Sequence, residues 1–339
     1  MKSLILRGVS TGPWDVLQNT FRERDFIDLA NHGIRYVKST CHLGNLVHGA
    51  DYTKKIAPNG ETCLSNWINQ ILALTELGIM VTPDISLSGS GTLNNSSFWT
   101  GSYADFIDLW GELATTFKQM KNIASLHPLH VPGHKGTGSK ADWDLITDLV
   151  IKKIRGIWPT VKISWMPFGM GWADFEGYLN HTGYYSTAEP LPFSNIIYNF
   201  NHYASEHHGT TGKVTHQKEA YRGNIEDLKH HLQPAINFKE KYGVEMQCSE
   251  WGLKDPEYDW INRKDWIRDM IMLFNSNGFN WAYWNMAIPS GYGGDWWSIL
   301  RDDHTWRLDL VKILAENVGG ASANAEILAL ISILLGLRG

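Results

Sequence analysis

The sequence predicts a single-domain α/β protein, a (β/α)8 TIM barrel that ends in a short apolar C-terminal tail. Eight short β-type runs alternate with longer helical stretches, the composition does not shift along residues 1–319, and no long internal repeat is visible. Alternating strands and helices indicate a parallel sheet. Because barrels of this class commonly occupy about 250 residues or more as one domain, a chain of 339 residues does not require two domains.

The eight predicted strands are residues 4–9, 34–38, 79–85, 123–129, 161–166, 195–200, 244–249 and 280–285. The helical stretches between them have recognisable ends. Gly33, Gly78 and Gly243 come directly before strands, where the left-handed residue that ends a helix is expected. Only the helix expected after the fifth strand, near residues 172–179, has a weak pattern. Seven helices are therefore clear.

The two ends of the chain carry separate signals. The apolar run within residues 1–7 is too short for the core of a signal peptide, so we assign it to the first strand. Residues 320–339 contain a small-residue linker and a nearly apolar stretch at 325–335, which is too short to cross a bilayer. We expect a helical tail that packs on the barrel or mediates self-association.

The composition excludes several functions. With 30 basic and 35 acidic side chains and a net charge of −5, the chain has no basic patch for nucleic acid. No membrane partner is expected. Three cysteines are an odd count, which argues against a disulfide framework. The 16 tryptophans stand out, because flat apolar rings stack on sugars and on planar ligands. A small-molecule or oligosaccharide ligand is expected.

Chemistry in a (β/α)8 barrel gathers where the strands end. The polar candidates at these ends are Lys38, His42, Asp84, Ser86, His130, Asn201, His202, Tyr203 and Glu250, and the aromatic candidates for substrate binding are Trp14, Trp165, Trp251 and Trp284. His127, His130 and His134 also cluster, but strand residues three apart face opposite sides, so the first two should not share an ion. No tight ligand motif completes the group. We predict no metal and no cofactor.

Several motifs occur in the order typical of one enzyme family. The chain opens with Arg-Gly-Val at 7–9, a helix over 21–33 leads into Tyr-Val-Lys at 36–38, and the seventh strand carries Ser-Glu-Trp-Gly at 249–252. Over residues 3–318 the chain resembles glycoside hydrolase family 5, the cellulase and mannanase type. That resemblance implies a secreted retaining glycosidase, although this chain shows no signal peptide. Such an enzyme uses two carboxyl groups about 5–5.5 Å apart.

The resemblance assigns the active-site positions residue by residue. The residues that match are Glu250 as the nucleophile, Tyr203 and the stacking residue Trp284. At five positions this chain departs from the family. Lys38 replaces an arginine, and Ser86 and Asn201 each replace a histidine. His130 replaces an asparagine, and Val131 replaces the acid/base glutamate. The framework signals are kept while neighbouring site residues differ, so we infer that the pocket is altered selectively.

Four functions follow as hypotheses. The first is a glycosidase scaffold re-tooled, by engineering or otherwise, so that Glu250 acts as a lone base or binding carboxylate in a Trp-lined pocket. The second is a glucan- or mannan-binding protein without activity. In the third, an active retaining β-glycosidase uses a non-standard acid such as His130 or His134. The fourth is Schiff-base catalysis by Lys38, as in a retro-aldolase; its alternative is a structural ion pair between Lys38 and Glu250.

Overall fold

The computed structural model of the chain describes residues 5–11, 21–42, 60–86, 103–130, 140–167, 183–203, 207–208, 214–215, 225–252, 263–287 and 298–317. Its barrel strands are β1 (Arg7–Ser10), β2 (Tyr36–His42), β3 (Met80–Ser86), β4 (His127–His130), β5 (Ile163–Trp165), β6 (Ile196–Tyr203), β9 (Glu245–Gly252) and β10 (Asn280–Trp284). The helices are α2 (Glu23–Asn31), α4 (Cys63–Glu76), α5 (Tyr103–Phe117), α6 (Lys140–Ile157), α7 (Ile225–Tyr242), α8 (Arg263–Ser276) and α9 (Leu308–Ala315). A 3-10 turn, η5 (Gly183–Ser186), and a small hairpin of β7 (His207–His208) and β8 (Val214–Thr215) complete the described elements.

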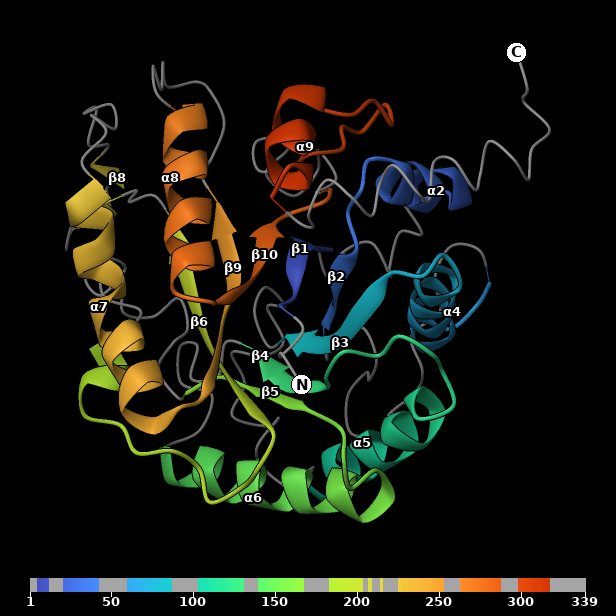
Figure 1. Cartoon of the computed structure of the whole chain (residues 1–339). Helices are drawn as coiled ribbons and strands as arrows, with labels where there is room; N and C mark the ends of the chain where they lie inside the picture. The colour runs from blue at the N-terminus through green and yellow to red at the C-terminus, as the bar shows by residue number, and fades with distance from the viewer. Residues whose placement is uncertain are drawn as a thin grey trace.

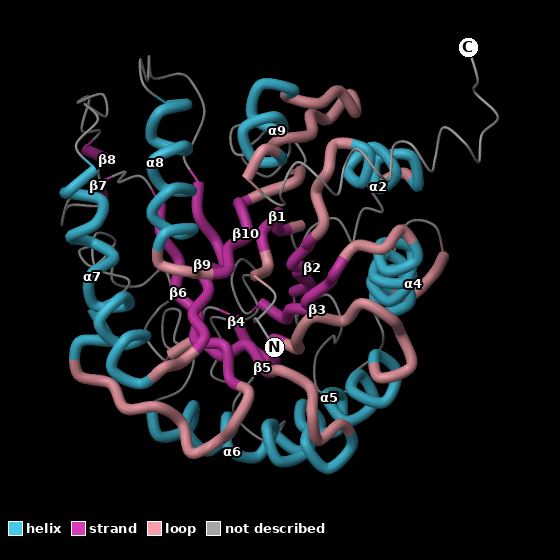
Figure 2. The backbone as a smooth tube through the Cα atoms, viewed as in Figure 1, coloured by secondary structure: helices cyan, strands magenta, loops and turns pink. Residues whose placement is uncertain are grey.

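The strands form a barrel with the helices around it (Figures 1 and 2). Their order is β4-β3-β2-β1-β10-β9-β6-β5, and the pairs are parallel. The two outermost strands meet through a parallel bridge between Leu126 and Ile163. There the Leu126 N–H donates to the Lys162 carbonyl at 3.0 Å, and the Ser164 N–H donates to the Leu126 carbonyl at 2.8 Å. The predicted (β/α)8 fold class is confirmed.

All eight predicted strands exist, with shifted ends. β6 and β9 continue to Tyr203 and Gly252, beyond the predicted ends, because pairing resumes after a register shift between Phe200 and Asn201. β4 begins only at His127, since the chain before it pairs through isolated bridges. The glycines before strands have positive φ, as predicted for helix ends: 88° at Gly33, 74° at Gly78 and 64° at Gly243. The expected helix at 172–179 and the tail at 320–339 lie outside the described residues.

Strand alternation selects the side chains inside the barrel. On β2, Tyr36, Lys38 and Thr40 are two residues apart, so they share the inner face, while Val37 packs in the apolar layer toward the helices. The Tyr36 hydroxyl donates to Thr82 on β3, which confirms the inward direction. The same rule therefore carries Lys38 and Thr40 to the upper, C-terminal part of the barrel interior.

A belt of hydrogen-bonded polar side chains crosses the barrel interior, which we call the hydroxyl belt. The Gln247 amide donates to the Tyr36 hydroxyl at 2.7 Å, and Tyr36 donates to Thr82 at 3.1 Å. The Thr82 and Ser125 hydroxyls lie 2.8 Å apart, and those of Ser125 and Ser164 lie 2.9 Å apart. All five side chains are buried. Because each buried hydroxyl has a partner, this polar layer is compatible with an interior site.

Many tryptophans belong to the layer between strands and helices. Trp67, Trp110 and Trp281 are 0% exposed, and their indole N–H groups donate to Ser39, Pro128 and Asn275 respectively. Each of these three indoles thus has its one polar atom satisfied. These rings explain part of the high tryptophan content as core packing, and not as ligand binding.

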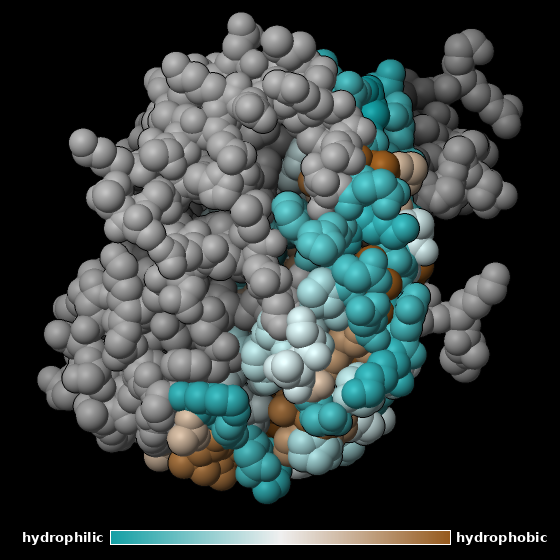
Figure 3. Space-filling model, turned by 90° about the vertical axis from the view of Figure 1, so that its left-hand side faces the viewer, coloured by the Kyte–Doolittle hydropathy of each residue, from teal (hydrophilic) through white to brown (hydrophobic). Residues whose placement is uncertain are grey.

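The described surface carries its apolar side chains singly. Large exposed hydrophobic residues such as Leu145, Met272 and Leu308 come from α6, α8 and α9. On the face in Figure 3, the hydrophobic colour appears as small separate patches among hydrophilic residues. None of the helices in the described ranges has the length and apolar character that crossing a membrane requires.

Candidate active site

A buried lysine lies at the centre of a polar cluster at the C-terminal ends of four strands. The Lys38 ammonium on β2 lies 3.2 Å from Oε1 of Glu250 on β9 and 3.4 Å from Oδ2 of Asp84 on β3. Nδ1 of His130 on β4 lies 3.4 Å from the ammonium and from each of these carboxylate oxygens. All four side chains are buried, so their charges interact strongly. The ion-pair alternative for Lys38 is therefore the arrangement observed.

The side-chain amide of Asn201 on β6 connects Glu250 with His130. The Ser249 hydroxyl donates to Oδ1 of Asn201 at 2.9 Å, so the amide nitrogen points the other way. That nitrogen donates to Oε2 of Glu250 at 3.2 Å and lies 3.3 Å from Nε2 of His130. Asn201 thus contacts Glu250 and His130 through the same amide nitrogen. Both oxygens of Glu250 are thus held by donors.

Asp84 is a site residue whose role was missed, although its place at a strand end was the available signal. The Thr40 hydroxyl donates to its Oδ2 at 2.7 Å, and Nδ1 of His127 lies 2.7 Å from its Oδ1. Burial alone would raise the pKa of Asp84, but Lys38, His130 and His127 together outweigh burial and hold that pKa well below its usual value. Asp84 is therefore ionised at neutral pH.

The predicted orientation of His127 is wrong. Residues three apart were expected on opposite faces of β4, yet His127 and His130 both lie beside Asp84, with ring centroids 5.4 Å apart. His127 pairs with Asp84 and His130 pairs with Ser86, so β4 contains one more residue than β3 between these two pairs. This irregularity turns both imidazoles inward. Among the residues that the structure describes, no group of three or more His, Cys, Asp or Glu is placed to hold a metal ion.

Burial of His127 makes stability depend on pH. Burial lowers the pKa of His127 to about 4, which the Asp84 carboxylate offsets only in part. The unfolded histidine takes up its proton near its ordinary pKa of about 6.5, so between about pH 6.5 and 4 the unfolded chain binds more protons. The free energy of unfolding should therefore fall by roughly 3 kcal/mol as the pH is lowered through that interval. Urea unfolding at a series of pH values measures this.

The matched variants for this prediction are His127→Gln and His230→Gln. The first removes the buried titrating group, so it should lose most of the pH dependence between these limits. His230 is exposed on α7, and its replacement should leave the dependence as in the wild type. The same pH slope in all three proteins would contradict the role of His127.

Trp284 gives the cluster an aromatic neighbour. It is the last residue of β10, it is half-buried, and its ring centroid lies 5.9 Å from the Lys38 nitrogen. The Lys38 ammonium therefore has both Trp284 and Glu250 as neighbours. Stacking of a ligand on Trp284 remains a prediction.

Three residues that we predicted to bind substrate point toward the helices. The Trp165 indole N–H donates to Thr147 on α6 at 3.3 Å. Trp251 is 0% exposed and packs against Trp266 on α8, and His202 stacks on that ring with an interplanar angle of 5°. The strand-end positions were identified correctly, but alternation sends these side chains to the outer face. The structure therefore places them in the core and not in the pocket.

Other predicted site residues are not described at the level of side chains. Trp14 and Val131 lie outside the described residues. His42 and Tyr203 end β2 and β6, but only their backbone is described. The proposed acid/base position at Val131 and the assigned role of Tyr203 therefore remain predictions from the resemblance.

Schiff-base chemistry at Lys38 does not fit the cluster. A Schiff base forms from a neutral amine that is free to attack a carbonyl carbon. Here the amine contacts carboxylate oxygens of Glu250 and Asp84, as an ammonium does in an ion pair. The arrangement instead suits a carboxylate whose orientation is fixed by hydrogen-bond donors.

Comparison with known proteins finds similarity to cellulases. Cellodextrinase A of Ruminococcus flavefaciens is 23% identical over 328 residues, which cover 84% of this chain and 88% of that protein. A hyperthermophilic endo-β-1,4-glucanase, solved in complex with substrate, matches with a TM-score of 0.71 and 15% identity, covering 92% of this chain and 97% of that one. The chain resembles family 5 cellulases. No family model matches the sequence.

A further solved structure agrees with this resemblance. Thermotoga maritima Cel5A in complex with mannotriose matches with a TM-score of 0.69 and 17% identity, over 92% of this chain and 97% of that chain. At such identities the solved structures establish the fold. The resemblance to glycoside hydrolase family 5 is confirmed at the level of the fold. An engineered origin or a loss of activity finds no support in these comparisons.

Proposed function

We propose that this protein is a glycoside hydrolase for β-linked glucans, with Glu250 as its nucleophile. The observation that carries the proposal is the Glu250 carboxylate itself, fixed by Lys38 and Asn201 at the C-terminal end of the barrel. Donors on both oxygens hold the carboxylate oriented for attack. In the first step an oxygen of Glu250 would bond to the anomeric carbon while the bond to the leaving oxygen breaks.

Neither Asp84 nor His130 is suited to protonate the leaving group. Asp84 is ionised and has no proton to give, as its lowered pKa shows. His130 Nδ1 lies 3.4 Å from Oε1 of Glu250, closer than the roughly 5–5.5 Å that separates the two catalytic groups of a retaining enzyme. The spacing leaves no room for a glycosidic bond between them, so we assign His130 to holding the nucleophile. Substrates with good leaving groups, which need little acid help, should react best.

Covalent trapping tests the nucleophile directly. A dinitrophenyl 2-deoxy-2-fluoro-β-cellobioside combines a good leaving group with a slow second step, so a glycosyl ester should accumulate. We expect intact-protein mass spectrometry to show one added glycosyl unit, and peptide mapping to place it on Glu250. Glu240→Gln, at an exposed position on α7, is the matched control and should be trapped normally. A fully folded protein that acquires no adduct would overturn the proposal.

Sugar binding without cleavage is the second candidate. Val131 stands where the family's acid/base residue is expected, which favours a loss of activity. In that case the trapping experiment gives no adduct, while migration through a native gel is still retarded by soluble β-glucan or mannan. Retardation together with an adduct on Glu250 would exclude this candidate.

Replacing Trp284 should weaken sugar binding more than chemistry. The ring lies beside the Lys38 and Glu250 pair, where a sugar attacked by Glu250 would sit. We expect Trp284→Ala to raise the KM for an aryl cellobioside by about tenfold, since the loss of one aromatic contact costs about 1.5 kcal/mol. Trp284→Phe keeps a ring and should recover part of the affinity. An unchanged KM in both variants would remove Trp284 from the binding site.

A further inference from the structure

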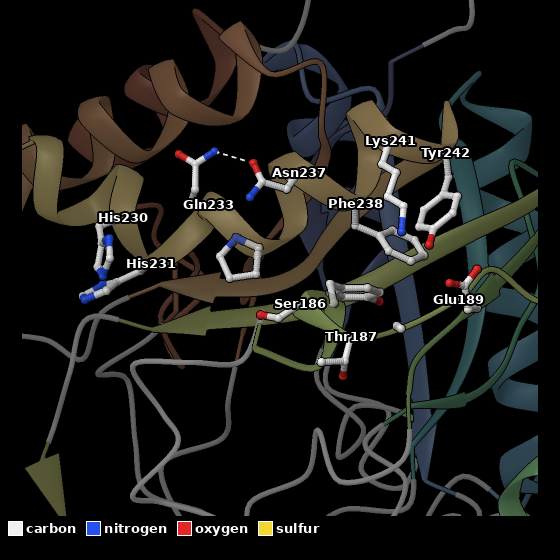
Figure 4. Close-up of a pocket in the computed structure, with 13 residues that line it drawn as sticks. Ser186, Thr187, Glu189, His230, His231, Gln233, Asn237, Phe238, Lys241 and Tyr242 are labelled. Atoms are coloured by element: carbon white, nitrogen blue, oxygen red, sulfur yellow. Dashed lines mark hydrogen bonds between the residues drawn. The ribbon is translucent and has the colours of Figure 1, made fainter.

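A second pocket lies on the outer side of the barrel, between η5 and α7 (Figure 4). Its volume is about 670 Å³, within the range of roughly 300–1,000 Å³ found for small-molecule sites. In a (β/α)8 barrel a helix is expected between the fifth and sixth strands. In the described residues directly before β6, the helical element is the four-residue turn η5. The pocket therefore lies beside a short turn that packs on α7, away from the Glu250 cluster.

The inner wall of this pocket is aromatic. Tyr185 and Phe238 are buried with ring centroids 4.9 Å apart, and Phe238 contacts Tyr242 at 5.0 Å. Tyr242 is half-buried, so part of its ring is open to the pocket. The Lys241 ammonium lies 4.5 Å from the centroid of the Tyr242 ring. The two buried rings thus support a third that can contact a ligand.

Hydrogen-bonding groups line the outer part of the pocket. On α7, the Gln233 amide donates to Oδ1 of Asn237 at 2.8 Å, which leaves the carbonyl of one and the nitrogen of the other for further bonds. Pro234 lacks an N–H and cannot donate to the backbone carbonyl of His230 one turn earlier. The Tyr242 hydroxyl is buried, and the Lys241 ammonium is its charged neighbour.

The charges around the pocket nearly cancel. Figure 4 shows Lys241 and Tyr242 extending from the end of α7 toward the segment that carries Glu189. The Lys241 ammonium and the Glu189 carboxylate interact, so one positive and one negative side chain face the same space. A pocket without net charge does not select ions. Aromatic surface beside amide and hydroxyl groups suits a neutral, polyhydroxylated ligand with a flat apolar face.

We propose that the pocket between η5 and α7 is a second binding site for a neutral β-linked oligosaccharide, separate from the active site. The choice of a β-glucan as the ligand rests on the proposed function. One strand serves both sites: Asn201 of β6 contacts Glu250 inside the barrel, while the next residue, His202, lies 6.0 Å from the ring of His231 at the edge of the pocket. A polymer anchored at this site would be retained close to the catalytic centre.

Affinity electrophoresis in gels with soluble β-glucan tests the second site. Two variants remove pocket groups, Tyr242→Ala and the exposed Asn237→Ala, and each should weaken retardation by about fivefold to tenfold. Lys229→Ala, on the same helix but outside the pocket, is the control and should migrate as the wild type. Hydrolysis of a short aryl glycoside should be unchanged in the pocket variants, because it requires only the active site.

The outcomes separate this proposal from the proposed function. If Tyr242→Ala misfolds, Asn237→Ala alone still gives the result, since its side chain is exposed. Wild-type retardation in correctly folded pocket variants would overturn the second site, whatever the trapping of Glu250 shows. Conversely, pocket-dependent retardation without an adduct on Glu250 would leave the second site in place and remove the hydrolytic function.

Discussion

Glu250→Gln should lower kcat/KM for an aryl β-cellobioside by roughly 10⁴-fold, because removal of a covalent nucleophile leaves only the contributions of binding and orientation. Glutamine has nearly the same shape, and its single amide oxygen can still accept from either Lys38 or Asn201, which now donate to different oxygens of Glu250. Binding should therefore change much less than the chemical step. Steady-state and single-turnover rates, measured on the same preparation, separate the two.

A charge change alone could also affect the rate, and a control addresses this. Glu240→Gln removes the same charge at an exposed position of α7, outside the buried cluster, and it should retain full activity. External azide offers a second check, since a small anion can attack the anomeric carbon where the carboxylate is missing. Wild-type activity in Glu250→Gln would exclude Glu250 as the nucleophile.

Lys38→Met should lower the free energy of unfolding by about 3–5 kcal/mol. The ammonium is 0% exposed and lies between the carboxylates of Glu250 and Asp84, so its removal leaves two buried negative charges without a counter-charge. A flexible apolar side chain fills most of the volume, and the loss is therefore electrostatic. Urea unfolding at pH 7 measures it.

Two comparisons test the electrostatic cause. Lys162→Met breaks a partly exposed ion pair with Glu245 and should cost about 1 kcal/mol or less. Adding Asp84→Asn to Lys38→Met removes one of the unpaired charges, so the double variant should be more stable than the single one. Equal losses for Lys38→Met and Lys162→Met would mean that the buried cluster has no special role in stability.

The fold could be predicted from the sequence because its signals are local and repeated. Apolar runs alternate with helical stretches, and glycines such as Gly33 and Gly78 mark helix ends through positive φ. Strand ends then give the positions of Lys38 and Glu250, since all parallel strands end on one side of a barrel. Such signals need no knowledge of distant contacts.

The directions of individual side chains were less predictable. Trp165 and Trp251 lie at strand ends like Glu250, but they face the helices, and composition alone does not distinguish the two faces. The inward turn of both His127 and His130 depends on an irregular pairing with β3, which no local pattern encodes. Asp84 was named as a strand-end residue, but its role was not predicted because it arises from neighbours on two other strands, β2 and β4.

The hydroxyl belt is one continuous chain of hydrogen bonds. Tyr36 accepts from an amide nitrogen and gives its single hydrogen to Thr82, and the hydroxyls of Thr82, Ser125 and Ser164 continue the chain. A slip of one residue in any of these strands would turn its polar side chain into the apolar outer layer and interrupt the whole sequence of donors. Lys38 follows Tyr36 by two residues, and Asp84 follows Thr82 by two. The hydroxyl belt thus fixes the strand register, and the spacing between Lys38 and Asp84 depends on that register.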